Sequence, residues 1–242
     1  AVSTTINSSG TQNILSGGSA SATVINTGGF QYVSSGGTAT GTKLSGGNQN
    51  ISSGGKAIDA EVHSGGKQTV YSGASASGTK LSGGTQNVSS GGSASATEVF
   101  SGGKQNIYAD GHVDSSIISN GGNQYIYSNG EATGATVNTS GFQYVSAGGT
   151  ATGTRLSGGN QNVSSGGKAI DAEVYSGGKQ TVYSDGEASG TQIFDGGMVN
   201  VSGGTVSGAS VNLNGRLNAY AGNVAGTILN KEGRQYIRSG AS

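Results

Sequence analysis

The chain has 242 residues, of which 49 are glycine, and it contains no proline, cysteine or tryptophan. Only 10% of the residues are charged, and the net charge of zero gives no electrostatic case for binding nucleic acid and little repulsion between copies. The sequence shows no apolar run that could cross a bilayer and no N-terminal charged-then-apolar signal, so we expect a mature, excised segment. The absence of cysteine agrees with passage through an oxidising compartment in an unfolded state.

The chain is built from an internal repeat. The segment Phe30–Tyr71 returns at Phe142–Tyr183 with only four substitutions. A glutamine that follows Gly-Gly-x recurs at nearly constant intervals, at Gln12, Gln31, Gln49, Gln68, Gln86, Gln105, Gln124, Gln143, Gln161 and Gln180. The same register continues through Val199 and Leu217 to Gln235. A period of about 20 residues predicts a solenoid.

Each unit reads G-G-x-Q-x-V-x-S-G-G-x-A-x-x-T-x-V-x-S, with two short alternating runs separated by glycine pairs. Alternation with period two predicts strands, and Gly-Gly predicts turns with positive φ. We therefore expect an all-β parallel β-solenoid of about thirteen coils of 18–19 residues, stacked into a rod roughly 60 Å long.

The aliphatic positions predict the inside of the rod. One expected column follows the glutamines, with the members Ile14, Val33, Ile51, Val70, Val88, Ile107, Ile126, Val145, Val163, Val182, Val201, Ala219 and Ile237. The other column has the members Ile25, Leu44, Val62, Leu81, Val99, Ile118, Val137, Leu156, Val174, Ile193, Val211 and Leu229. Small residues such as Ala39 lie two positions after a glycine pair and would let the wall turn tightly.

The glutamines lie on the same face as the aliphatic residue two positions later, and Val199 and Leu217 occupy their position near the C-terminus. This pattern indicates a buried glutamine ladder with amides bonded from coil to coil. A solvated corner is the alternative. From Met198 the unit loses its strict form, so we expect one β-helical region over residues 1–242, with regular repeats in 1–197 and divergent repeats in 198–242. Neither end shows an obvious polar cap, which suggests a longer native chain.

Two close carboxylate pairs, Asp59/Glu61 and Asp171/Glu173, are the only candidates for acid–base chemistry of the kind found in β-helical polysaccharide lyases. In the expected register Asp59 has only glycines as coil neighbours, while Glu61 falls in the series Lys43–Glu61–Lys80–Glu98. Alternating charge of this kind predicts a structural ladder, worth about 0.2–1 kcal/mol for each exposed pair.

Other chemistry has little support. The two histidines have no cysteine or second histidine in register, which argues against a zinc site or a histidine-based triad. A repeated calcium nonapeptide, a regular threonine array for ice binding and a phosphate loop in a strand-to-helix context are all missing. We expect no catalytic residues, no metal site and no cofactor.

Two outward features are candidate sites. The first is a group of five aromatic residues in three successive coils, namely Tyr108, Tyr125, Tyr127, Phe142 and Tyr144. They could form a contact surface, although aromatic residues also favour strands because they stack across them. Serine pairs before Gly-Gly fit ordinary turn chemistry but would also offer a modifying enzyme a repeated geometry: Ser34, Ser35, Ser52, Ser53, Ser89, Ser90, Ser164 and Ser165.

The unit, seen for example as SGGTQNVSSGGSASATEVFSGGKQNIY at Ser82–Tyr108, closely resembles the repeat of AIDA-type self-associating autotransporters, the group that includes TibA and antigen 43. The resemblance covers nearly the whole chain. It implies a right-handed β-helix in a passenger domain at the surface of a Gram-negative bacterium, anchored to the outer membrane or secreted through a C-terminal β-barrel. AIDA- and TibA-like members are O-heptosylated on serine or threonine by a heptosyltransferase, whereas antigen 43-like members work without obligatory glycosylation.

The resemblance and the residues together predict a non-enzymatic adhesin. Its expected partners are other copies of itself on neighbouring cells, which gives autoaggregation and biofilm formation, together with host cell surfaces and a cytoplasmic heptosyltransferase. A polysaccharide-active β-helix enzyme and a passive structural stalk are the alternatives.

Overall fold

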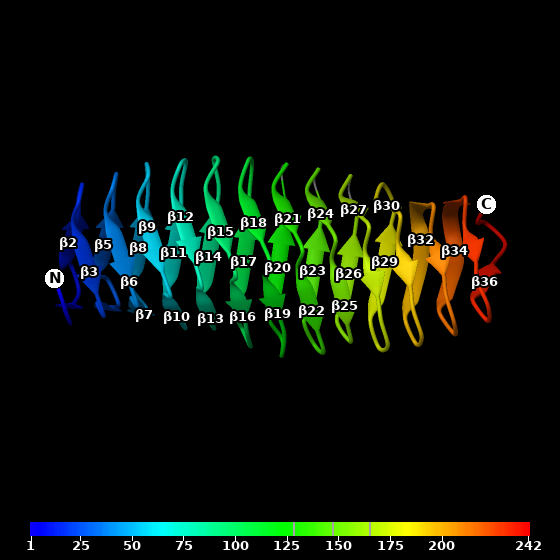
Figure 1. Ribbon diagram of the computed structural model, residues 1–242, viewed down its shortest axis with the longest axis horizontal. Helices are drawn as coiled ribbons and strands as arrows, with labels where there is room; N and C mark the ends of the chain where they lie inside the picture. Colours follow the sequence, from blue (N-terminus) through cyan, green and yellow to red (C-terminus); the bar gives the residue numbers. More distant parts are fainter. Residues whose placement is uncertain (128, 147, 165) are drawn as a thin grey trace.

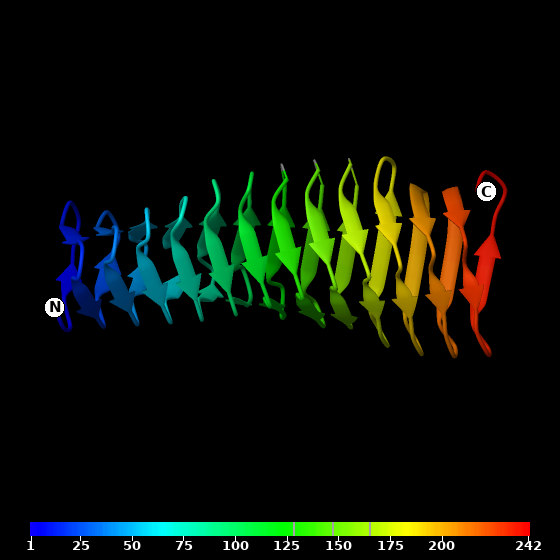
Figure 2. The same cartoon turned by 45° about the horizontal axis from the view of Figure 1, so that its top comes forward.

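The computed structural model of the chain describes residues 1–127, 129–146, 148–164 and 166–242. Throughout these ranges every regular element is a β-strand, and the strands form a right-handed parallel β-solenoid. The coils stack in sequence order along one axis, with the two chain ends at opposite ends of the rod (Figures 1 and 2). In the part of the chain described here, we find no helix with the length and apolar character needed to span a membrane.

Each coil has three walls, which we name after their buried residues. The Gln strands carry the glutamine and the following aliphatic residue. They are β2 (Thr11–Ile14), β5 (Phe30–Val33), β8 (Asn48–Ile51), β11 (Lys67–Val70), β14 (Thr85–Val88), β17 (Lys104–Ile107), β20 (Asn123–Ile126), β23 (Phe142–Val145), β26 (Asn160–Val163), β29 (Lys179–Tyr183) and β36 (Arg234–Ile237).

The Ala strands form the second wall and bury one residue each, which is alanine in every strand below except β18, where it is Val113. They are β3 (Ser19–Ser21), β6 (Thr38–Thr40), β9 (Lys56–Ile58), β12 (Ser75–Ser77), β15 (Ser93–Ser95), β18 (His112–Asp114), β21 (Glu131–Thr133), β24 (Thr150–Thr152), β27 (Lys168–Ile170) and β30 (Glu187–Ser189). Near the C-terminus β32 (Met198–Ser207) and β34 (Arg216–Ala225) each run through both the Gln wall and the Ala wall.

The Val strands close the coil and bury the second aliphatic residue. They are β1 (Thr5–Ile6), β4 (Val24–Asn26), β7 (Lys43–Ser45), β10 (Glu61–His63), β13 (Lys80–Ser82), β16 (Glu98–Val99), β19 (Ile117–Ile118), β22 (Thr136–Asn138), β25 (Arg155–Ser157), β28 (Glu173–Val174), β31 (Gln192–Ile193), β33 (Ser210–Val211) and β35 (Ile228–Leu229).

Every strand pairs in parallel with the equivalent strand of the next coil. Gln68, for example, is in register with Gln49 on one side and Gln86 on the other. The Val strands form one 13-stranded sheet, while β32 and β34 join the other two walls into a 23-stranded sheet. Over the described residues the chain completes about twelve full turns, because the Ala wall has one strand fewer than the Val wall. The prediction of about thirteen coils was therefore close, with the first and last coils incomplete.

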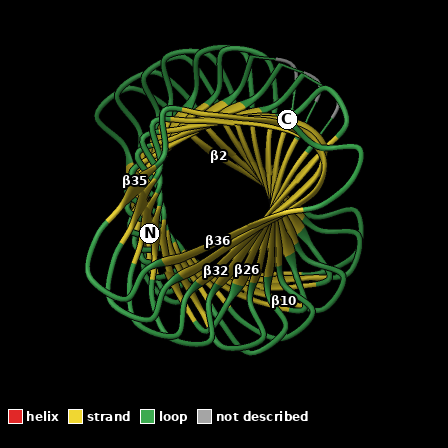
Figure 3. Cartoon of the chain, turned by 90° about the vertical axis from the view of Figure 1, so that its right-hand side faces the viewer, coloured by secondary structure: helices red, strands yellow, loops and turns green. Residues whose placement is uncertain are grey.

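The predicted aliphatic columns form the core. From Ile14 to Ala219 on the Gln wall, and from Ile25 to Val211 on the Val wall, the members are buried. In the last coil Leu229 and Ile237 are 52% and 48% exposed, because within the structure no further coil covers them. Viewed down the rod axis, the strands surround the core and the turns project outward, and successive coils are rotated about the axis (Figure 3).

The glutamine ladder is confirmed, and the solvated-corner alternative is wrong. From Gln31 to Gln180 each glutamine is completely buried and donates from its Nε2 to the Oε1 of the preceding glutamine at 2.7 Å. In most coils a hydroxyl from the Val wall also donates to that Oε1, as Thr97 does to Gln86 at 3.2 Å. A buried amide ladder satisfies its polar groups without water, so it can run through an apolar core.

The ladder ends where the repeats diverge. Val199 takes the place of a glutamine, and Ala209 takes the place of the corresponding hydroxyl residue, so neither polar partner is present. In the next coil Leu217 replaces the glutamine but Thr227 keeps its hydroxyl, and that oxygen is buried without a hydrogen-bond partner. The register nevertheless persists through Val199, Leu217 and Gln235, with β-bulges between β29 and β32 and between β32 and β34.

The coils have two lengths. From Gln12 to Val199 the difference lies in the turn between the Val strand and the Gln strand, whereas the two coils from Val199 to Gln235 are shortened between the Gln strand and the Ala strand, where the β-bulges lie. The longer coils use a wider turn, such as Asn26–Gly29, which is closed by a 2.9 Å backbone hydrogen bond. Three of the shorter coils tighten this turn, and there Gly46, Gly83 and Gly158 form a backbone bridge to the preceding coil with φ between 81° and 86°. Glycine is favoured there because the conformation is left-handed, and at Gly46 and Gly158 a threonine hydroxyl of the preceding coil also occupies the space of a Cβ atom.

Candidate functional site

The outer surface of the Gln wall carries the predicted aromatic residues. Outward side chains alternate with buried ones along each strand, so equivalent outward residues form columns about 4.8 Å apart along the rod. Tyr125 and Tyr144 are paired neighbours in one such column, through strands β20 and β23. We call the five residues Tyr108, Tyr125, Tyr127, Phe142 and Tyr144 the aromatic patch.

The aromatic patch is one continuous stack. Ring centroids lie 5.7 Å apart for Tyr108–Tyr127, 5.9 Å for Tyr125–Tyr127, 4.9 Å for Tyr125–Tyr144 and 6.1 Å for Phe142–Tyr144, with interplanar angles from 4° to 19°. Tyr108 is 39% exposed and the other four are half-buried. The structure thus brings all five residues together, as expected, but much of the ring surface is covered within the stack.

The phenols of this patch give a prediction for alkaline pH. Burial, followed by the neighbouring Tyr108 and Tyr125, raises the pKa of Tyr127, and burial, followed by Tyr125 and Tyr183, raises the pKa of Tyr144. Because the pKa of each phenol is higher in the folded state than in the unfolded state, the contribution of the phenol to folding stability is fully present below pH about 10. That contribution is lost as the pH rises through the folded pKa. We expect urea midpoints to fall above pH about 10, and the fall to be shallower in a Tyr127→Phe/Tyr144→Phe variant. Parallel profiles for parent and variant would contradict this assignment.

Two further aromatic stacks were not predicted. Phe30 stacks on Tyr32 with centroids 6.1 Å apart, and Tyr175 stacks on Phe194 at 4.7 Å. The Arg155 guanidinium lies 4.8 Å from the Tyr175 ring centre and forms a 2.8 Å ion pair with Glu173. The register of the repeat could have revealed the second stack, since Tyr175 and Phe194 occupy equivalent positions in successive units.

The candidate serines fall into two classes. In each Ser-Ser-Gly-Gly segment the backbone carbonyl of the first serine accepts a hydrogen bond from the N–H of the second glycine, as Ser52 does from Gly55. The first serines are half-buried: Ser34, Ser52, Ser89 and Ser164. The second serines occupy the turn apex and are exposed: Ser35, Ser53 and Ser90. The eighth candidate, Ser165, lies outside the described residues.

A second set of exposed serines lies at the turns between the Val strands and the Gln strands. Ser64, Ser101 and Ser176 occupy the apices of the wider turns there. The same Ser-Gly-Gly signal marks them in the sequence. They were missed because a search for a doubled serine finds only one of the two glycine-pair turns of a coil, the one between the Gln strand and the Ala strand.

The carboxylates of the two Asp/Glu pairs contact ion-pair partners or backbone glycines of neighbouring coils. Glu61 lies 3.2 Å from Lys43 and 3.5 Å from His63, and Lys80 lies 3.8 Å from Glu98. The Asp59 carboxylate lies directly over Gly78 of the next coil, as Asp171 does over Gly190. Among the described residues no group of three or more His, Cys, Asp or Glu could hold a metal ion.

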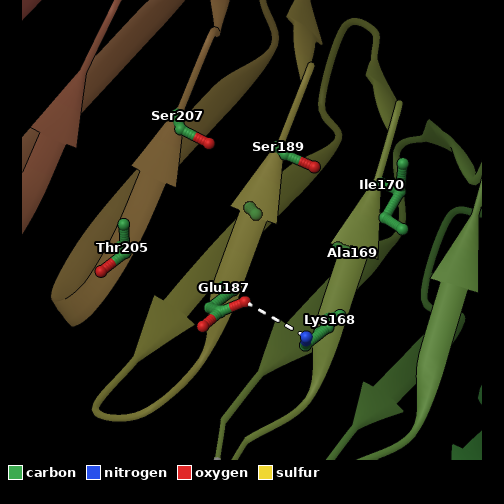
Figure 4. Close-up of a pocket in the computed structure, with 8 residues that line it drawn as sticks. Lys168, Ala169, Ile170, Glu187, Ser189, Thr205 and Ser207 are labelled. Carbon is green, nitrogen blue, oxygen red and sulfur yellow. Dashed lines mark ion pairs between the residues drawn. The ribbon is translucent and has the colours of Figure 1, made fainter.

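The Ala wall carries a shallow depression of about 350 Å³ near the C-terminal third of the rod. It lies between two outward columns of β27, β30 and β32, where a 3.7 Å ion pair joins Lys168 to Glu187 (Figure 4). Its remaining lining consists of small hydroxyl and aliphatic side chains, namely Ala169, Ile170, Ala188, Ser189, Thr205 and Ser207. The one acid in this lining, Glu187, is therefore already paired with Lys168.

The comparisons with known proteins agree with this geometry. Residues 1–48, 50–103 and 108–160 match the AIDA family model, described as "Adhesin of bacterial autotransporter system, probable stalk". The crystal structure of a "TibC-catalyzed hyper-glycosylated TibA55-350 fragment" superimposes with a TM-score of 0.96 at 42% sequence identity, covering 100% of this chain and 90% of that one. None of the curated protein sequences gives a match. The chain therefore belongs to the AIDA family of bacterial autotransporter adhesins and forms a β-helical passenger segment of such an adhesin.

Proposed function

We propose that this segment mediates autoaggregation: rods on neighbouring cells pair side by side at the cell surface of a Gram-negative bacterium. The aromatic patch carries the proposal. It is a contiguous group of half-exposed rings on a wall whose outward columns continue from coil to coil, and tyrosine is strongly enriched at the centres of protein interfaces. Two copies present the same spacing, so contacts made at one coil can recur at the next.

Weak contacts are sufficient for this role. The net charge is zero, so whole rods do not repel one another at long range. On a crowded cell surface many rods engage at once, and each further contact forms at a high effective concentration. Clumping and biofilm formation then follow from avidity and require no catalytic step.

Beads coated with this fragment, produced without any glycosyltransferase, test the proposal. We expect coated beads to clump and a Tyr125→Ser/Tyr144→Ser variant to clump several-fold less. A Tyr32→Ser/Tyr71→Ser variant is the matched control, because it removes two exposed rings from the same wall outside the patch. Equal loss in both variants, or no clumping by the parent fragment, would contradict self-recognition through the aromatic patch.

We also propose that exposed apex serines, Ser35, Ser53 and Ser90 among them, accept O-linked heptose from a heptosyltransferase. The similarity to a TibA fragment that is glycosylated by TibC supports this, as does the exposure of these serines at the turns. Intact-mass measurement on protein from its own host should show heptose increments that decrease in a Ser35→Ala/Ser53→Ala/Ser90→Ala variant. An unmodified mass of the protein from its own host would contradict the proposed heptosylation.

A passive stalk is the second candidate, and the description of the family as a stalk favours it. A stalk would present another part of the protein, including any part that binds host cells, without self-association of the fragment. The absence of bead clumping together with retained adhesion of the whole protein would select this function.

A further inference from the structure

The outer Gln wall of the last coils carries a second cluster, distinct from the aromatic patch. Arg216 and Arg234 are paired neighbours in one outward column, and Tyr220 and Arg238 lie one coil apart in another. Tyr236 stands between these columns, and all five side chains are exposed. We call Arg216, Tyr220, Arg234, Tyr236 and Arg238 the Arg–Tyr cluster.

The charges of this cluster break the pattern of the rest of the rod. Elsewhere among the described residues, where the register pairs two charged residues of neighbouring coils, their charges are opposite, as for Arg155 and Glu173 at 2.8 Å. Here two arginines meet, and none of the ion pairs among the described residues includes Arg216, Arg234 or Arg238. Like charges directly opposite one another destabilise a sheet. Such local conflicts concentrate at functional sites, where a ligand of opposite charge removes the repulsion.

The tyrosines hold two of the arginines in defined positions. The Arg238 guanidinium lies 4.8 Å from the Tyr220 ring centre, and that of Arg216 lies 6.0 Å from the Tyr236 ring centre. A guanidinium stacked on a ring keeps its N–H edge free for bidentate hydrogen bonds to a carboxylate, sulfate or phosphate group. Arg216, Tyr220, Tyr236 and Arg238, together with Met198 and Asn218, line a shallow depression of about 270 Å³.

We propose that the Arg–Tyr cluster binds an acidic polysaccharide that lies along the rod axis. The last two coils place Arg216 and Arg234 about 4.8 Å apart in one column, a spacing close to the rise of one sugar residue in an extended polysaccharide. The acidic groups of the polymer pair with the arginines, while Met198 and the tyrosines offer apolar surface to the sugar rings. This binding is separate from self-association, since the cluster lies beyond the aromatic patch along the rod.

Binding of the whole fragment to immobilised heparin and to polygalacturonate, with neutral dextran as the blank, tests this proposal. We expect salt-sensitive binding to an acidic polymer, weakened about tenfold or more in an Arg216→Gln/Arg238→Gln variant. A Lys56→Gln/Lys104→Gln variant is the control, since it removes the same charge from exposed lysines elsewhere. An Arg238→Lys variant should lose part of the affinity, because lysine keeps the charge but lacks the planar guanidinium that forms two parallel hydrogen bonds with one acidic group.

The proposal would be overturned by equal losses in the arginine and lysine variants, by binding to dextran, or by binding to phosphatidylglycerol vesicles without binding to either polymer. Inorganic phosphate at the same ionic strength should compete no better than chloride does, and strong competition by phosphate would indicate a site for a single small anion. Bead clumping without polysaccharide should be unchanged in the arginine variant, so failure of this proposal and failure of self-association are distinguishable.

Discussion

Replacing Gln124 with leucine is expected to lower the free energy of unfolding by about 2–4 kcal/mol. Gln124 is completely buried, donates to Gln105 and accepts from Gln143, both at 2.7 Å. Leucine fills similar space but leaves the Gln143 amide without its acceptor in a dry interior. An unsatisfied buried donor costs about 1–3 kcal/mol in addition to the hydrogen bonds that are lost.

Urea unfolding followed by circular dichroism measures this cost. Asn106→Ala is the matched control, because the Asn106 amide also donates to the preceding coil, at 2.8 Å to Asn87, but lies on the outer face where water can replace it. We expect the control to cost about 1 kcal/mol or less. Equal costs for the two variants would show that the buried ladder is no more important than an exposed one.

Replacing Gly159 with alanine is expected to cost about 3 kcal/mol or more. A Cβ atom at this position would lie 2.5 Å from Val137 Cγ1 and 2.6 Å from the backbone oxygens of Val137 and Asn138. These backbone oxygens cannot move aside without breaking backbone hydrogen bonds between neighbouring coils, so the tight turn of this shorter coil would have to open.

Gly41→Ala separates this steric cost from the cost of backbone conformation. Gly41 has a φ of 62°, but nothing lies within 4 Å of the place of its Cβ atom, so only the left-handed conformation is penalised, by about 1–2 kcal/mol. Thermal unfolding of both variants gives the comparison. A Gly159 variant that is as stable as the Gly41 variant would mean that the coils adjust their spacing more easily than the contacts imply.

The architecture of the rod is predictable from the repeat alone. A glutamine in almost every repeat, with an aliphatic residue two positions later, predicts parallel strands, the register of the coils and the core columns. These features are predictable because each coil repeats the same local environment, so side-chain alternation alone assigns the inner and outer positions. Near the C-terminus the apolar residues Val199 and Leu217 occupy the glutamine position, and this also indicates that the position is buried.

Features that depend on how neighbouring coils contact one another required the three-dimensional structure. It showed the hydroxyls of residues such as Thr97 completing the glutamine ladder, because that contact joins two different walls of the rod. It separated half-buried Ser52 from exposed Ser53, since the φ of 47° at Ser53 places that residue at the turn apex. It also brought Arg238 onto Tyr220, a contact set by side-chain rotamers across one coil, which the periodicity of the backbone does not determine.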